Sequence, residues 1–162
     1  MGAVVDLDAV KDRLCREVDD RAELLIDVAH QIHDHPELGF HERFAHDLLT
    51  DVLGAEGFAT EPHAYGLETA FAARAGSEGP VIAVMCEYDA LPEIGHACGH
   101  NVIAAAGLGA ALAAAALAEE LGGRVLVLGT PAEEGGGGKV LMSRRGALDG
   151  VVGVPHLTGH LE

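Results

Sequence analysis

Residues 80–86 read Pro-Val-Ile-Ala-Val-Met-Cys, an uninterrupted apolar run of the length of a β-strand. Such a run is typical of a strand in a parallel sheet whose two faces are both covered by helices. A second run of the same character, Arg-Val-Leu-Val-Leu-Gly, occupies residues 124–129. Together the two runs predict central strands of an α/β fold.

The segment between these strands predicts a buried helix over residues 99–121. Residues 102–118 are almost wholly Ala, Gly, Leu, Val and Ile, and Gly122 and Gly123 mark the helix end. The order strand, helix, strand implies a crossover between parallel strands. A transmembrane helix is the weaker interpretation, because the run is shorter than about 20 residues and no basic flank follows it.

The flanking segments predict the rest of one domain. Apolar spacing predicts helices over 7–35, with one possible break, and over 41–53. Strands are predicted at 58–63 and 69–74, as a possible edge hairpin, and at 151–154, with a short helix at 140–145. The predicted fold is a three-layer α/β structure whose mostly parallel central sheet is flanked by helices.

Composition excludes several classes of partner. The chain has 26 Asp and Glu against 10 Lys and Arg, and its formal net charge of −16 would repel nucleic acid and anionic membrane surfaces. Residues 1–12 carry acids where a secretory signal has a basic region and an apolar run, so a cytoplasmic location is expected. Three cysteines without an export signal are better explained as free thiols or metal ligands than as a disulfide framework.

Polar clusters follow both predicted central strands. Residues 87–92 follow the first strand, 130–134 follow the second, and 95–100 read Gly-His-Ala-Cys-Gly-His. Ligands of open parallel sheets bind beyond the carboxyl ends of the strands, so we expect these clusters on one rim. If the 95–100 loop is extended, Cys98 and His100 project to one side, and thiolate with imidazole suits zinc or a similar divalent ion. The start of the following helix should help the Cys98 thiol to ionise.

Glu133 and Glu134 are adjacent, so their side chains point in different directions and can have different roles. One carboxylate can bind a metal while the other faces water. A metal lowers the pKa of bound water from 15.7 to about 7, and a nearby carboxylate can take the proton and later deliver it to a departing amine. Asp89 can orient a ligand histidine.

Structural explanations stay open for each of these features. Cys98 can be a buried thiol, Asp89 can cap a turn, and Glu133 and Glu134 can be solvated surface acids. The four glycines at 135–138 can let backbone approach a substrate or can form a flexible connector.

Four segments, at residues 32–40, 86–92, 95–101 and 131–135, resemble in order and spacing the aminoacylase-like metallopeptidase and amidohydrolase family. The nearest branch holds hippurate hydrolases, auxin-conjugate hydrolases, aminobenzoyl-glutamate hydrolases and Xaa-Arg type dipeptidases. The resemblance extends to about Gly150. It implies that residues 1–162 form the N-terminal portion of a zinc-exopeptidase-like catalytic domain, without the lid and dimerisation domain and without the C-terminal return segment.

The resemblance also implies roles for individual residues. Cys98 would bridge two metal ions, zinc or manganese, His100 and Glu134 would each bind one, and Glu133 would act as the general base. Asp89 matches the acid that, in the family, contacts a metal ligand without binding the metal itself. The implied reaction is hydrolysis of the amide bond of an N-acyl amino acid or dipeptide.

Two further positions are compared with the family pattern. Glu87 stands where many relatives have a ligand histidine, as is usual in the cysteine-containing branch. A further ligand histidine is expected after the Gly-Ala-Leu-Asp-Gly segment, and His156 is the nearest candidate, with His160 as the fallback.

Three functional hypotheses follow. The first is a metal-dependent amidohydrolase acting on small molecules, with a homo-oligomer expected and inactivity possible for this chain alone. The second is a non-catalytic metal-binding or interaction module, and the third is a structural α/β module without stoichiometric metal. A missing return segment would leave sheet edges and apolar faces uncovered, which predicts self-association or marginal stability.

Overall fold

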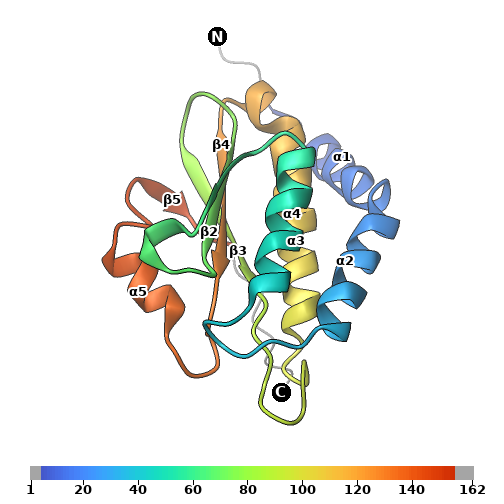
Figure 1. The fold of residues 1–162 in the computed structure, drawn as a ribbon. Coiled ribbons are helices and arrows are strands. Elements are labelled where there is room, and N and C mark those ends of the chain that lie inside the picture. The colour runs from blue at the N-terminus through green and yellow to red at the C-terminus, as the bar shows by residue number, and fades with distance from the viewer. Residues whose placement is uncertain (1–4, 156–162) are drawn as a thin grey trace.

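The computed structural model describes residues 5–155 (Figure 1). The elements along the chain are α1 (Leu7–Asp19), α2 (Ala22–Asp34), α3 (Arg43–Ala55), β1 (Ala59–Pro62), a short 3-10 turn (Ala64–Gly66), β2 (Phe71–Ala75), β3 (Val81–Glu87), α4 (His100–Leu121), β4 (Arg124–Thr130), α5 (Gly138–Arg144) and β5 (Val151–Gly153). All the predicted helices and strands are confirmed, and the first helix is broken once, between α1 and α2.

One five-stranded sheet runs through the molecule in the order β1-β2-β4-β3-β5. β3 is parallel to both β4 and β5, so the predicted crossover through α4 is confirmed. β1 and β2 form the predicted hairpin at one edge, and β2 also pairs antiparallel with β4. The central strands β3, β4 and β5 are therefore parallel, as predicted, and the edge hairpin joins them through the antiparallel pairing of β2 with β4.

Helices cover the sheet on both faces, which confirms the layered α/β architecture (Figure 1). α1 to α4 lie on one face and α5 lies on the other, with the larger apolar core under the first group and a smaller one under α5. Ile32, Leu49 and Leu108 are fully buried in the larger core, and Met142 and Leu128 are buried in the smaller one.

α4 is the central helix of this core. It packs against β3, β4, α1 and α2. By length and composition α4 is apolar enough to cross a membrane, but most of its residues are buried inside the fold. At Gly107 the helix lies so close to β3 that an added Cβ would be 2.6 Å from the Met85 carbonyl oxygen. This packing is that of a core helix in a globular protein.

The segment before α3 is tied to that helix by a carboxylate. The two oxygens of Glu37 accept hydrogen bonds from the backbone N–H groups of Phe44, at 3.0 Å, and Ala45, at 3.1 Å. These are amides of the first helical turn, which have no acceptor within the helix. Glu37 thus fixes residues 36–42 against the start of α3.

Candidate metal centre

The loops after β3 and β4 leave the same edge of the sheet. The two strands pair so that Glu87 lies opposite Thr130, and the chain turns away from the sheet directly after each (Figure 1). Because the strands are parallel and in register, the acidic clusters that follow them come together. The expected common rim is therefore present.

Cys98, His100 and Glu134 converge on this rim. Their sulfur, nitrogen and oxygen atoms all lie within 4.8 Å of one another, and Nε2 of His100 is 3.7 Å from Oε1 of Glu134. Donor atoms about 2.0 to 2.3 Å from one tetrahedral ion are separated by roughly 3.3 to 3.8 Å. The donor types and the separation of His100 and Glu134 therefore fit a divalent cation such as zinc.

A second group shares His100 and adds Glu87 and Glu133. Nε2 of His100 is 3.3 Å from Oε2 of Glu87 and 3.8 Å from Oε2 of Glu133. The structure thus surrounds one imidazole nitrogen with three carboxylates, a concentration of negative charge that favours cations.

Asp89 fixes the orientation of His100. Nδ1 of the imidazole is 2.8 Å from the backbone oxygen of Asp89 and 2.9 Å from its Oδ1, so a proton on Nδ1 leaves Nε2 directed at the acidic cluster. Burial lowers the pKa of His100, but the hydrogen bond and charge of Asp89 outweigh burial and raise that pKa above its usual value. Asp89 lies where an orienting carboxylate was expected.

Asp89 also connects the two loops. Its Oδ2 accepts a hydrogen bond of 3.0 Å from the backbone N–H of Glu134. Burial pushes the pKa of Asp89 upward, yet the hydrogen bond from His100 and those from the Glu134 and Glu133 amides bring that pKa below its usual value. One buried carboxylate therefore positions a candidate ligand from each loop.

The loop that carries Cys98 is turned, so the condition of an extended loop is not met. Gly99 has φ of 82°, a left-handed conformation that suits glycine, and it brings Cys98 and His100 together through a bend. Burial raises the pKa of the half-buried Cys98 thiol, and Glu134 raises it further. A backbone hydrogen bond from His100 lowers the pKa of Cys98 without offsetting these effects, so the expected ease of ionisation is not seen in this pKa.

His96 stands apart from both groups of candidate ligands. Its buried ring faces the ring of His33, with 6.4 Å between the centroids, and burial lowers the pKa of His96.

Sequence reasoning missed Lys139 as a member of the site. Its ammonium donates to Oε1 of Glu87 and lies 3.5 Å from Oε1 of Glu133. No sequence signal marked this lysine, because its place depends on how the chain folds back between β4 and α5. The glycines of this turn are required for that reversal: an added Cβ at Gly136 would be 2.6 Å from the Ala132 Cβ, and one at Gly138 would be 1.9 Å from the Pro131 oxygen.

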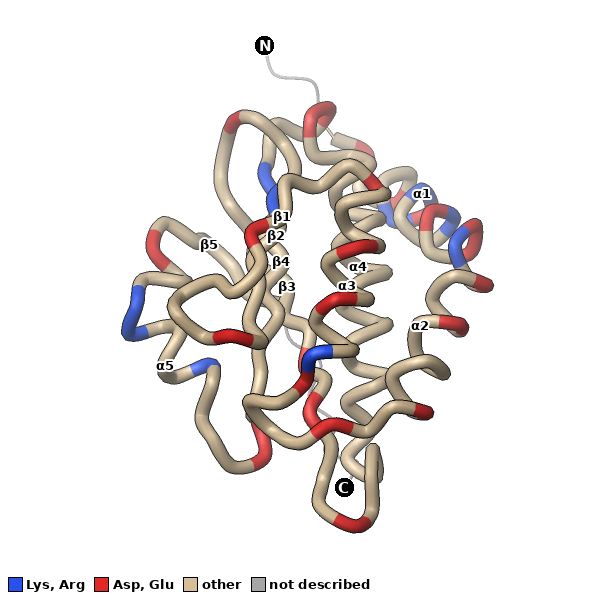
Figure 2. Tube along the Cα trace, viewed as in Figure 1, with Lys and Arg blue, Asp and Glu red and all other residues tan. Residues whose placement is uncertain are grey.

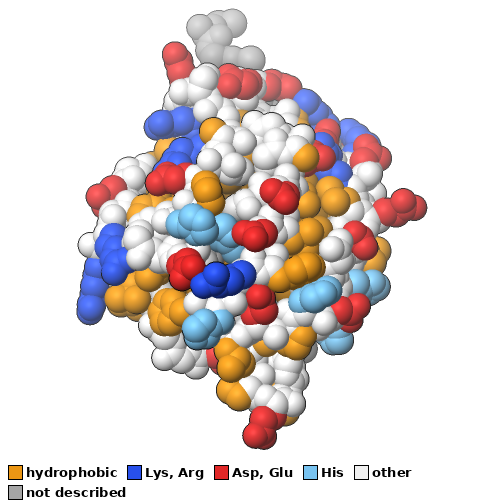
Figure 3. All heavy atoms as spheres, in the orientation of Figure 1, with side chains coloured by type: hydrophobic (Ala, Val, Ile, Leu, Met, Phe, Trp, Pro, Cys, Tyr) orange, Lys and Arg blue, Asp and Glu red, His pale blue; other side chains and the backbone are white. Residues whose placement is uncertain are grey.

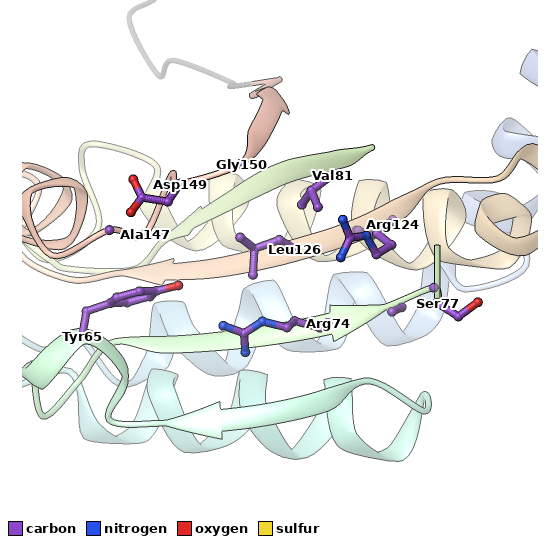
Figure 4. A pocket seen from close by; sticks show the side chains of 13 residues that line it. Tyr65, Arg74, Ser77, Val81, Arg124, Leu126, Ala147, Asp149 and Gly150 are labelled. Carbon is purple, nitrogen blue, oxygen red and sulfur yellow. The ribbon is translucent and has the colours of Figure 1, made fainter. Parts of the chain in front are cut away.

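His156 and His160 lie outside the described residues, so their expected role as a further ligand stays a prediction. A cavity of about 390 Å³ lies elsewhere, on the sheet face that carries α5, and is lined by residues that include Tyr65, Arg74, Arg124 and Asp149 (Figure 4). None of the candidate ligands lines it. We place the site at the acidic cluster, because that is where metal-binding atoms converge.

Charges of both signs are distributed over the molecule. Asp and Glu are spread along the helices and the loops at the rim (Figure 2). On the face drawn in Figure 3, acidic, basic and histidine side chains lie close to one another above the middle of the molecule. The expectation that nucleic acid is not a partner stays a prediction.

Comparison with known proteins relates this chain to a family. The model of the peptidase family M20/M25/M40 matches residues 83–160. The Xaa-Arg dipeptidase of Mus musculus is 41% identical over 91% of this chain and 37% of its own length. A subunit of the p-aminobenzoyl-glutamate hydrolase of Escherichia coli (strain K12) is 38% identical over 77% of this chain and 30% of its own length.

A solved structure supports the same relationship. The YXEP protein of Bacillus subtilis, described as a dinuclear metal binding peptidase from the M20 family, superposes with a TM-score of 0.73 at 31% identity. The alignment covers 82% of this chain and 41% of that one, so the chain spans well under half the length of these three relatives. By sequence and by fold, this chain is related to the peptidases of family M20/M25/M40.

Proposed function

We propose that this chain forms the metal-holding part of an amidohydrolase that cleaves the amide bond of N-acyl amino acids or dipeptides. The observation that carries the proposal is the convergence of Cys98, His100 and Glu134 at the ends of two adjacent parallel strands. Relatives named as a dipeptidase and as an aminobenzoyl-glutamate hydrolase support the reaction class. Residues 1–162 would be the N-terminal portion of the catalytic domain.

The proposed ligands are Cys98, His100 and Glu134, with His156 as a further candidate. Cys98 would bridge two ions, zinc or manganese, as the family resemblance implies. Asp89 would hold His100 with Nε2 directed at the ions. When bound, a divalent ion would polarise the amide carbonyl and make a water molecule more acidic.

Glu133 is the proposed general base. Its side chain is 36% exposed, so water and substrate can reach it, while His100 beside it is only 4% exposed. Lys139 lies beside Oε1 of Glu133, and Oε2 is on the side of His100. That oxygen would take a proton from the attacking water and later give it to the departing nitrogen.

Metal analysis of the purified chain tests the site. We expect the parent to bind zinc or manganese stoichiometrically and Cys98→Ala to lose most of that metal. Cys15→Ala is the matched control, because Cys15 is an exposed thiol in α1. Equal metal content in the parent and Cys98→Ala would refute the assignment.

Glu133→Gln separates catalysis from metal binding. We expect this variant to keep its metal and to lose release of free amino acid from N-acyl amino acids and dipeptides, measured on this chain and on any longer protein that contains it. Unchanged turnover in a protein whose parent is active would remove Glu133 as the base. Metal binding without turnover in either form would favour a non-catalytic metal-binding module.

A further inference from the structure

Glu42 is a buried acid that the proposed mechanism does not use. Its side chain is fully buried, and among the described residues no Lys or Arg pairs with it. Oε2 accepts a hydrogen bond of 2.7 Å from the Thr69 hydroxyl, and Oε1 accepts one of 2.8 Å from the backbone N–H of Ala132. Burial raises the pKa of Glu42. A carboxylate buried without a cationic partner is costly, so it calls for an explanation.

Ala132, the residue that Glu42 holds, immediately precedes Glu133. It has φ of 53°, a left-handed conformation that is unusual for a residue with a side chain. An added Cβ at Gly39 would be only 2.8 Å from the Ala132 Cβ, so residues 39–42 press directly against this turn. The conformation of Ala132 is therefore imposed by its neighbours, and Glu42 supplies the hydrogen bond.

Glu133 is held on both sides. The amide before it, of Ala132, donates to Glu42, and the amide after it, of Glu134, donates to Asp89 at 3.0 Å. The two acceptors come from different loops, at residues 42 and 89. Together they fix the direction in which the Glu133 and Glu134 side chains leave the backbone.

The side chain of Glu42 does not cap its own helix, although hydrogen bonds from the backbone of Glu42 and Phe40 partly offset the effect of burial on its pKa. Glu42 stands at the N-cap of α3 but makes no capping hydrogen bond with its side chain, and Glu37 accepts from the first-turn amides instead. Thr69 is itself anchored, because the Tyr88 hydroxyl donates to its backbone oxygen. The Thr69 hydroxyl thus holds one oxygen of the Glu42 carboxylate, and the other oxygen is directed at the turn that carries the two glutamates.

We propose that Glu42 is a positioning residue, which orients Glu133 and Glu134 by accepting a hydrogen bond from the backbone N–H of Ala132. The proposal rests on the proposed function only for the roles of the two glutamates. The orientation of the two glutamates is expected to depend on the length of the Glu42 side chain and not on its charge, since a neutral side chain of the same length can accept the same hydrogen bond.

Two substitutions of Glu42 distinguish the effect of side-chain length from the effect of charge. Glu42→Gln keeps the length and an oxygen acceptor, and its amide can donate to the Thr69 hydroxyl. Glu42→Asp keeps the charge but withdraws the oxygens by one methylene. Glu37→Gln is the matched control, since Glu37 is a glutamate of the same segment whose side chain accepts hydrogen bonds from the Phe44 and Ala45 amides of α3.

Two readouts are used on the chain of 162 residues. Amide hydrogen exchange by NMR reports on the Ala132 and Glu134 amides, and zinc titration reports on the site. For Glu42→Asp we expect both amides to exchange about ten-fold faster and zinc affinity to fall about 10-fold, the lower end of what loss of a supporting contact costs a metal site. Glu42→Gln and Glu37→Gln should stay within about two-fold of the parent in both readouts.

The outcomes are decisive in both directions. The proposal would be overturned if the Glu134 amide exchanged in Glu42→Asp as slowly as in the parent. It would also be overturned if Glu42→Gln showed the same faster exchange and weaker zinc binding as Glu42→Asp. If the parent itself binds neither zinc nor manganese, the proposed function fails, while amide exchange still decides the role of Glu42. If Glu42→Asp does not fold, Thr69→Val, which releases the other carboxylate oxygen, provides the comparison with Glu42→Gln.

Discussion

Replacing Gly107 by alanine tests how closely α4 must lie on β3. An added Cβ would be 2.6 Å from the Met85 oxygen and 3.0 Å from the Cys86 sulfur, whereas 3.4 Å is an ordinary contact. Backbone cannot rotate out of the way, so α4 has to move from β3 by several tenths of an ångström. Overpacking of this kind costs about 1–3 kcal/mol, and the better helix propensity of alanine returns about 1 kcal/mol.

Gly109→Ala is the matched control. Its added Cβ would meet the far end of the Leu25 side chain, at 2.8 Å, and that side chain can change rotamer. The gain in helix propensity is the same at both positions. We therefore expect Gly107→Ala to be less stable than Gly109→Ala by at least about 1 kcal/mol.

Urea unfolding followed by circular dichroism measures this difference. His100 begins α4, two helical turns before Gly107, so displacement of the helix should also weaken zinc binding in Gly107→Ala. Equal unfolding free energies for the two variants would refute the reasoning, because they would show that α4 has room above β3.

Three further predictions concern buried groups. Tyr88→Phe leaves the Thr69 oxygen without its buried donor and should cost about 1–3 kcal/mol in urea unfolding, and no loss relative to Tyr65→Phe would contradict this. Burial raises the pKa of Glu42 above 4.5, so the native state binds the proton more tightly than the unfolded chain. Relative to Glu42→Gln, the parent should therefore lose stability as the pH rises from below 4.5 through the raised pKa. A stability difference between the two proteins that does not change with pH would be evidence against this prediction. Exposed Cys15 should react first with a thiol reagent, and half-buried Cys98 should react more slowly. Burial raises the pKa of Cys86 to about 12, so this buried thiol should react only on unfolding. Zinc should protect Cys98 alone.

The sequence predicts the elements of this fold well, because their signals are local. The apolar runs at 80–86 and 124–129 and the alanine-rich helix between them fix the crossover, and the crossover fixes which loops share a rim. The antiparallel entry of β2 beside β4 was not predictable, since strand direction at that edge depends on how the hairpin docks.

The sequence points to the candidate site where residue types that can bind metal follow the two strands, and not where the site depends on tertiary contacts. Cys98, His100 and Glu134 are recognisable because soft and hard donors cluster after two strands. Lys139 and Glu42 reach the site only through the folded turns around Gly138 and Ala132, and isolated charged residues carry no sequence signal for such contacts.

The pairing of β3 with β4 has a consequence for folding kinetics. The candidate ligands on either side of α4 meet only after this helix has crossed the sheet and both strands have paired, a non-local event that is intrinsically slow. A cation would therefore find its complete set of candidate ligands only in the late stages of folding. Bound metal should lengthen the lifetime of the native state by slowing unfolding, while leaving the rate of folding nearly unchanged.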